Sequence, residues 1–183
     1  MRRGALRRDL VEAAQHGDHE AFEVLATSAG DRLYAVAFLI LRAADLAEDA
    51  VQEALVRAWK QLPALRDPDK FDAWLHRLLV NACADQGRQL RRWSQQVRPL
   101  ARDTSTGDHA VSVADRDQLE RGFSRLKPEQ RAVLVLHYYN GFSTAEIAGI
   151  LSIPQGTARS RLHYATEAMR AALEADARHP VVA

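Results

Sequence analysis

The sequence predicts an all-α protein of two small helical domains joined by a flexible linker, the second a helix-turn-helix domain. Apolar residues recur at helical spacing along most of the 183 residues, and no segment alternates as a strand would. One polar segment with proline and glycine lacks any apolar period. We therefore expect domains at 1–93 and 115–176, a linker at 94–114 and a tail at 177–183.

The first domain is expected to hold four helices. No proline occurs from Leu6 to Leu62, after which Pro63 and Pro68 bracket a loop. Asp18 is a suitable N-cap for a long apolar helix. The expected helices span 8–15, 18–40 with a break near Gly30, 46–61 and 71–92.

The second domain resumes the helical pattern at Asp115. A further helix is expected from Pro128, which suits a helix start, to Gly141, which suits a helix end. Its last turn holds His137 followed by two tyrosines, and the strongly apolar context favours packed core positions for all three.

Two short helices and a tight turn are predicted between Phe142 and Leu162. Ser143 and Glu146 form a capping box, and Pro154 ends the first of these helices. In the second, one face gathers hydrogen-bond donors suited to base edges and phosphates: Gln155, Gly156, Arg159, Ser160 and His163. A helical hairpin in an ordinary core is the alternative. The coincidence of cap, turn and polar face favours a DNA-reading helix-turn-helix.

An acidic and amide face is predicted on the helix from Asp45 to Leu62. Alanines and aliphatic residues point inward at helical spacing, whereas the opposite side carries Asp45, Asp49, Gln52 and Glu53. Such a face is either solvated or a docking surface for a basic partner.

Aromatic residues surround the proline-bracketed loop, and Arg77, Asn81 and Arg88 follow on the next helix. Burial in a helical core is the interpretation we favour for Trp74. Aromatic faces with amide and guanidinium groups are also typical of proteins that hold an unstacked base.

Composition and motifs exclude several classes of function. Net charge is only +1, so nucleic-acid binding requires local patches. No phosphate loop, zinc-protease motif or nucleophile elbow occurs, so we expect neither an enzyme nor a cofactor or metal. His16 and His19 are expected to be solvated, and the lone Cys83 to be a buried core residue. With no run of about 18 apolar residues, a soluble cytoplasmic protein is expected.

The two motifs, DLAEDAVQEALVRAWKQL and GFSTAEIAGILSIPQGTARSRL, occur in that order across a variable linker. This arrangement resembles a bacterial RNA polymerase sigma factor of the extracytoplasmic-function (ECF) type, over about residues 18–173. The resemblance implies that Asp49, Gln52 and Glu53 dock on the clamp helices of the largest subunit of core RNA polymerase.

The same resemblance implies two promoter-DNA surfaces. Asn81 matches the asparagine near the pocket for a flipped base of the -10 element, and the loop before Phe71 matches the one that shapes this pocket. Phe71, Arg77 and Arg88 complete the expected DNA-binding surface. The -35 element is expected to face Gln155, Gly156, Thr157, Arg159, Ser160 and His163. An anti-sigma factor is common in that family, although no residue of this sequence identifies one.

Ser152 departs from the family pattern, which usually has glycine at this turn, so either strain in a left-handed conformation or a slightly different turn is expected there. The alternative function is a stand-alone helix-turn-helix regulator whose first domain senses a ligand or dimerises. A sensor domain requires a ligand cavity, and the sequence offers no polar cluster for one.

Overall fold

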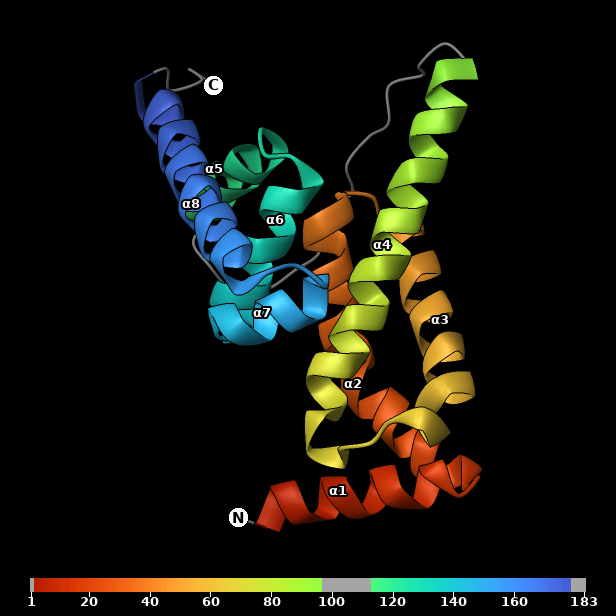
Figure 1. The fold of residues 1–183 in the computed structure, drawn as a ribbon. Helices are drawn as coiled ribbons and strands as arrows, with labels where there is room; N and C mark the ends of the chain where they lie inside the picture. The colour runs from red at the N-terminus through yellow and green to blue at the C-terminus, as the bar shows by residue number, and fades with distance from the viewer. Residues whose placement is uncertain (1, 97–112, 179–183) are drawn as a thin grey trace. The chain divides into compact units, whose positions relative to one another are not determined.

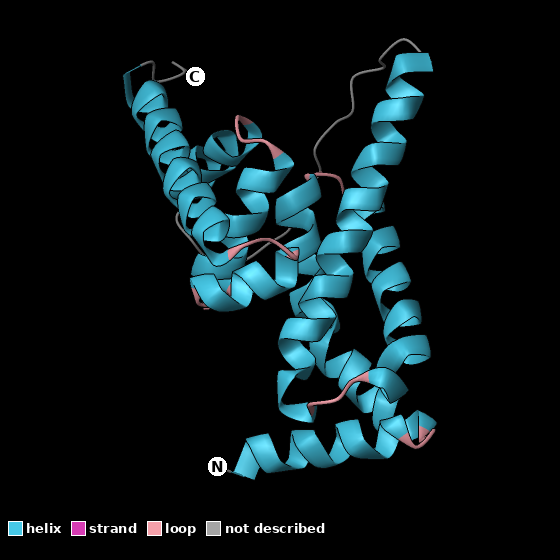
Figure 2. Ribbon diagram, viewed as in Figure 1, coloured by secondary structure: helices cyan, strands magenta, loops and turns pink. Residues whose placement is uncertain are grey.

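The computed structural model describes residues 2–96 and 113–178 (Figure 1). All regular elements in these two ranges are helical and none is a strand (Figure 2), which confirms the all-α prediction. The chain divides into two compact units between Ala101 and Arg102. Each unit has its own core, described below.

The first unit is a bundle of three long helices with a fourth helix across one end (Figure 1). α2, α3 and α4 pack against one another, while α1 packs on α2 and on two 3-10 turns, η1 and η2, that precede α4. The elements are α1 (Arg2–Gln15), α2 (His19–Leu41), α3 (Ala44–Gln61), η1 (Leu62–Ala64), η2 (Pro68–Lys70) and α4 (Phe71–Gln96).

The core of this unit follows the apolar spacing of α2 and α4. Leu25 and Leu33 from α2 and Leu75 and Leu79 from α4 are at most 1% exposed. α2 continues through Gly30, so the expected break is wrong. The roughly 1 kcal/mol cost of a helical glycine is offset by the burial of apolar residues on either side of it.

Three helix ends lie beyond the predicted positions. α1 begins at Arg2, α4 continues to Gln96, and α5 begins at Val113, so both ends of the expected 94–114 linker are helical. The remainder of that linker lies outside the described residues. Apolar periodicity missed the end of α4 because its last turns are polar, yet arginine and glutamine are good helix formers.

The second unit is built around its last helix, which contacts the three other α-helices. Its elements are α5 (Val113–Ser124), α6 (Pro128–Leu134), the π-helix η3 (Val135–Tyr139), α7 (Thr144–Leu151) and α8 (Gln155–Arg178). α5 approaches α8 closely at Gly122, where a Cβ atom would lie 2.9 Å from Cε of Met169. A larger residue there would displace that methionine.

The π-helix changes the direction of the side chains that follow it. The Asn140 N–H donates to the Val135 carbonyl at 3.1 Å, five residues back. Tyr138 and Tyr139 are 67% and 50% exposed, so the prediction that they are packed core residues is wrong. The wider turn shifts both rings off the buried stripe. His137 is half-buried and its Nδ1 lies 2.9 Å from the Phe142 carbonyl.

α2 is long and apolar enough to cross a membrane by length and composition, with a mean hydropathy of 1.5 over its best window. The expectation that no such stretch exists was wrong, since Asp31 and Arg32 are the only charged residues from Val24 to Leu41. Its buried stripe, however, packs on α1, α3 and α4. That is the behaviour of the core helix of a bundle.

Cys83 lies in the core of the first unit, as predicted. Its side chain on α4 is 2% exposed. Burial raises the pKa of the thiol to about 12, so it stays protonated at neutral pH. A protonated, inaccessible thiol is unreactive.

Candidate functional site

The outer face of α3 has the geometry that the sequence predicts. Asp49, Gln52 and Glu53 are exposed, while Ala50 and Ala54 are buried on the opposite side. An acidic face of this kind suits a basic partner.

Val56 also lies on this face and was missed by the sequence reasoning. It follows Gln52 by one helical turn and is 47% exposed. The sequence could have revealed Val56, because an aliphatic residue at a solvent-facing helical position suggests a contact surface.

A chain of ion pairs links α3 to α4. Arg57 Nε lies 2.7 Å from Glu53 Oε1, and Arg57 Nη2 lies 3.1 Å from Asp85 Oδ2. Asp85 also pairs with Arg88. These bonds raise the pKa of the Arg57 guanidinium, chiefly through the hydrogen bond to Glu53. Through Arg57 and Asp85, Glu53 on the α3 face is thereby connected with Arg88 on the α4 face.

The polar face of α4 carries three of its four predicted DNA-binding residues. Arg77, Asn81 and Arg88 fall on one side of the helix, with Asn81 and Arg88 exposed and Arg77 half-buried. Phe71 does not join them. Its ring is 2% exposed, lies 5.8 Å from the Trp74 ring and is covered by the Arg7 guanidinium, so it cannot stack on a base in this conformation.

The tryptophans also serve the core. Trp74 is 9% exposed, which confirms its predicted burial. Trp59 packs on α2, where its ring lies 4.4 Å from His19 and 5.0 Å from Phe22. The predicted base-reading surface of α4 therefore offers amide and guanidinium groups, with no exposed ring from Phe71 or Trp74.

His16 and His19 are both exposed, as predicted, and each has a partner within the protein. His16 Nδ1 lies 2.7 Å from the Glu12 carbonyl, and His19 stacks on Trp59. Within the described residues, no group of three or more His, Cys, Asp or Glu side chains is placed to hold a metal ion.

The capping box of α7 is present as predicted. The Ser143 N–H donates to Glu146 Oε2 at 2.8 Å, and the Glu146 N–H donates to Ser143 Oγ at 3.3 Å. Hydrogen bonds from the Ser143 hydroxyl and backbone lower the pKa of the Glu146 carboxyl. This box fixes the start of the first helix of the helix-turn-helix.

The turn of the motif is left-handed at Ser152, with φ 53° and ψ 45°. The left-handed conformation expected at this position is confirmed, and a residue with a side chain is disfavoured there. α8 starts at Gln155, directly after Pro154. The turn thereby sets the N-terminus of α8 against α7.

The N-terminal half of α8 presents the predicted polar face. Ala158 and Ala165 are fully buried, which turns the other side outward. Thr157 is half-buried, and its carbonyl accepts from Ser160 Oγ at 3.0 Å. The exposed residues of the face are Gln155, Gly156, Arg159, Ser160 and His163. Tyr164, beside His163, is 67% exposed and extends the donor surface beyond the predicted set.

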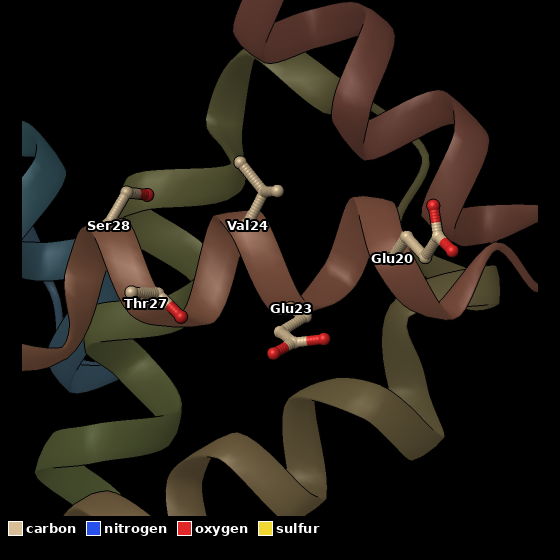
Figure 3. Close-up of a pocket in the computed structure, with 5 residues that line it drawn as sticks. All are labelled: Glu20, Glu23, Val24, Thr27 and Ser28. Atoms are coloured by element: carbon tan, nitrogen blue, oxygen red, sulfur yellow. The ribbon is translucent and has the colours of Figure 1, made fainter.

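One further surface feature lies on α2, away from these faces. It is a shallow groove of about 460 Å³ lined by Glu20, Glu23, Val24, Thr27 and Ser28, all on α2 (Figure 3). Its described lining comes from one helix alone, so the groove is open and not the enclosed cavity that a ligand-sensing domain would need.

Comparison with known proteins assigns both units. Sigma-70 region 2 matches residues 25–93, and sigma-70 region 4 matches residues 116–169. The chain is 38% identical over 135 residues to the ECF RNA polymerase sigma factor SigL of Mycobacterium tuberculosis, covering 70% of this chain and 75% of that protein. It is 32% identical over 153 residues to SigM of the same species, covering 84% and 77%.

Solved structures agree with the sequence relatives. The sigma factor RpoE of Bartonella quintana, in complex with the anti-sigma factor NepR, has a TM-score of 0.71 at 26% identity, over 85% of this chain and 98% of that one. CnrH, in complex with the cytosolic domain of CnrY, has a TM-score of 0.67 at 26% identity, over 93% and 99%. With two all-α units, a polar-faced helix-turn-helix and these relatives, the chain belongs to the ECF RNA polymerase sigma factors of the sigma-70 family.

Proposed function

We propose that this sigma factor directs core RNA polymerase to promoters through three surfaces. Asp49, Gln52 and Glu53 on α3 dock on the clamp helices of the largest subunit. Arg77, Asn81 and Arg88 on α4, with the 62–70 loop, hold the opened -10 element. The α8 face reads the -35 element. The polymerase supplies the chemistry, and the chain supplies binding and base recognition.

The observation that carries the proposal is the exposed donor face at the N-terminal end of α8. Five of its six predicted residues are exposed, and the buried alanines behind them fix its orientation. A helix that enters the major groove contacts base edges with the side chains of its first turns. Arg159, Ser160 and His163 occupy those turns.

Support for the other two surfaces comes from exposure and charge. The α3 face is acidic and carries an exposed valine one helical turn after Gln52, as a docking surface for a basic, partly apolar helix pair would. On α4, guanidinium and amide groups share one face, which suits phosphates and an unstacked base.

An anti-sigma factor and a cytoplasmic location belong to the same proposal. RpoE was determined in complex with the anti-sigma factor NepR, and CnrH in complex with the cytosolic domain of CnrY. An anti-sigma factor would compete for the α3 and α8 surfaces. Because the polymerase acts in the cytoplasm, the chain acts there too.

Transcription in vitro tests the proposal. Purified chain and core polymerase are supplied with genomic fragments from the source organism, and the transcripts are sequenced. We expect new start sites that require the chain and that share two upstream sequence elements, a -10 element and a -35 element. The chain alone should bind the same fragments weakly.

Start sites that do not depend on the added chain would contradict this function. Tight, sequence-specific binding by the chain alone, without polymerase, would favour the stand-alone regulator. No structural feature of the described residues favours that alternative.

A further inference from the structure

The N-terminal helix α1 holds the loop that precedes α4 at both of its ends. Val11 and Ala14 anchor α1 on the bundle, at 0% and 2% exposure. Next to these anchoring residues, α1 also contacts the turns η1 and η2. Three side chains of α1 reach the segment from Leu62 to Asp72.

Gln15 makes the central contact. Its Nε2 lies 3.1 Å from the Leu62 carbonyl oxygen and 2.6 Å from the Leu65 carbonyl oxygen. An amide NH₂ has two hydrogens, so one group satisfies both carbonyls. Because these bonds are partly buried, a residue without donors would remove one of the two bonds to the Leu62 carbonyl, which also accepts from the Leu65 N–H at 3.0 Å, and the Gln15 bond to the Leu65 carbonyl.

Two arginines hold the other end of the loop. Arg8 Nη1 lies 2.8 Å from Asp69 Oδ2, and its Nε lies 2.9 Å from Glu12. Arg7 pairs with Asp72 and lies over the Phe71 ring, 5.6 Å from its centroid. Exposed ion pairs contribute little individually, so the arginines support the contact that Gln15 specifies.

The held loop turns its exposed side chains outward. Ala64, Arg66 and Lys70 are exposed, whereas Leu62 is fully buried. Within the loop, Asp67 Oδ1 accepts from the Asp69 N–H at 3.1 Å. A base that enters beside this loop would meet a fixed backbone, and the precision of its position would depend on α1.

We propose that Gln15 is a positioning residue for reading the -10 element, acting through the shape of the 62–70 loop. This inference rests on the proposed role of that loop in the -10 pocket. Gln15 itself touches no base. It sets where the loop backbone lies, so its loss reduces discrimination among -10 sequences more than it reduces polymerase binding.

The test uses the full chain with core polymerase and a promoter library randomised in both elements. Gln15→Met keeps the size of the side chain without its donors, and Gln15→Glu replaces them with acceptors. The control is Val36→Ala on α2, a fully buried position that lowers stability without touching the loop. Hydrogen exchange of the free chain reports the loop directly.

We expect both Gln15 variants to exchange the loop amides about 5- to 30-fold faster, as the loss of one or two hydrogen bonds implies. Their -10 preferences flatten, while their -35 preferences and polymerase affinity match the wild type. Val36→Ala keeps its -10 preference.

Unchanged exchange in the loop would overturn the positioning role. Faster loop exchange with an intact -10 preference would also overturn it, as would an equal loss of -10 preference in Val36→Ala. In either case the transcripts made with the wild-type chain would still support the proposed function. A wild-type chain without any -10 preference would instead overturn the proposed function and this inference together.

Discussion

Ser152 occupies a backbone conformation that glycine adopts without penalty. Its φ of 53° places a Cβ atom against the following carbonyl, which costs an L-residue about 1–2 kcal/mol. Glycine loses about 0.5–1 kcal/mol through its greater freedom in the unfolded chain. The balance favours glycine at the end of α7.

We expect Ser152→Gly to raise the free energy of unfolding of the second unit by about 0.5–1 kcal/mol. Urea denaturation followed by circular dichroism measures it. Ala145→Gly is the matched control, because this exposed residue of α7 is helical and should lose about as much as Ser152→Gly gains. Equal destabilisation by both variants would show that the turn is unstrained.

His76 makes the first unit sensitive to acid. Its ring on α4 is 5% exposed, and Nδ1 donates to the Asp72 carbonyl at 2.8 Å. Burial lowers the pKa of His76 below 6.5; nearby Arg32 and Arg7 lower it further, and Asp72 opposes them. The folded unit therefore binds a proton less readily than the unfolded chain.

Stability should consequently be flat above pH 6.5 and fall below it. From about pH 6.5 down towards the pKa of His76 in the folded protein, the free energy of unfolding of the wild type should fall by up to about 1.4 kcal/mol per pH unit, relative to its value at neutral pH. His76→Gln should remove this part of the slope. Parallel pH profiles for the two proteins, measured by urea denaturation, would exclude His76 as the cause.

At the scale of elements, α3 shows the clearest division between a buried face and an exposed polar face. Alanines fill the buried side and allow close packing on α2 and α4, while the opposite side carries the Glu53–Arg57 pair. Such an exposed pair contributes about 0.3–0.5 kcal/mol.

Replacing Gln52 and Glu53 together by alanine should weaken polymerase binding by about tenfold or more, with the helical signal unchanged because alanine is the best helix former. Fluorescence titration with labelled chain measures the affinity. Glu23→Ala on α2 removes one charge from the same unit and should bind normally. A loss of helical content in the double variant would place these residues in the fold instead.

Element identity was largely predictable, and element ends were not. The apolar spacing of α2, the capping box of α7 and the buried alanines of α8 are local patterns, so the sequence reveals them. The first turns of α1 depend on partners more than 50 residues away, such as Asp69 and Asp72, which no local pattern contains. Tyr138 and Tyr139 were misplaced because the α-helical period was assumed for a segment that forms a π-helix, whose i→i+5 hydrogen bonds give a wider turn.

The predicted site shows the same division. Exposure of Asn81, Arg159 and Glu53 followed from helical geometry. The burial of Phe71 did not, because it depends on Arg7 and Trp74 from α1 and α4 closing over the ring. Tertiary packing decides such cases, and a single sequence does not display it.

For the whole molecule, promoter reading is divided between two units with separate cores. Asn81 lies in the first and Arg159 in the second, so each variant should act on its own promoter element. Sites without shared partners have additive effects, within about 0.3–0.5 kcal/mol.

We expect Arg159→Ala to lose about 1–3 kcal/mol of discrimination at one base pair of the -35 element, and to keep the -10 preference. Asn81→Ala should do the reverse, and the double variant should show the sum of both. Transcript counts from the randomised promoter library measure all three. An equal loss on every sequence would identify Arg159 as a phosphate contact.

Cys83 is the chain's single cysteine, and it lies inside the first unit. A thiol reagent can therefore modify the chain only when that unit opens, whatever the second unit does. With the thiol's pKa near 12 in the folded state and its ordinary value restored on opening, the labelling rate at mild alkaline pH measures how often the first unit opens. The opening of the first unit can thus be measured in the intact chain, while the second unit, which carries the helix-turn-helix, is still attached.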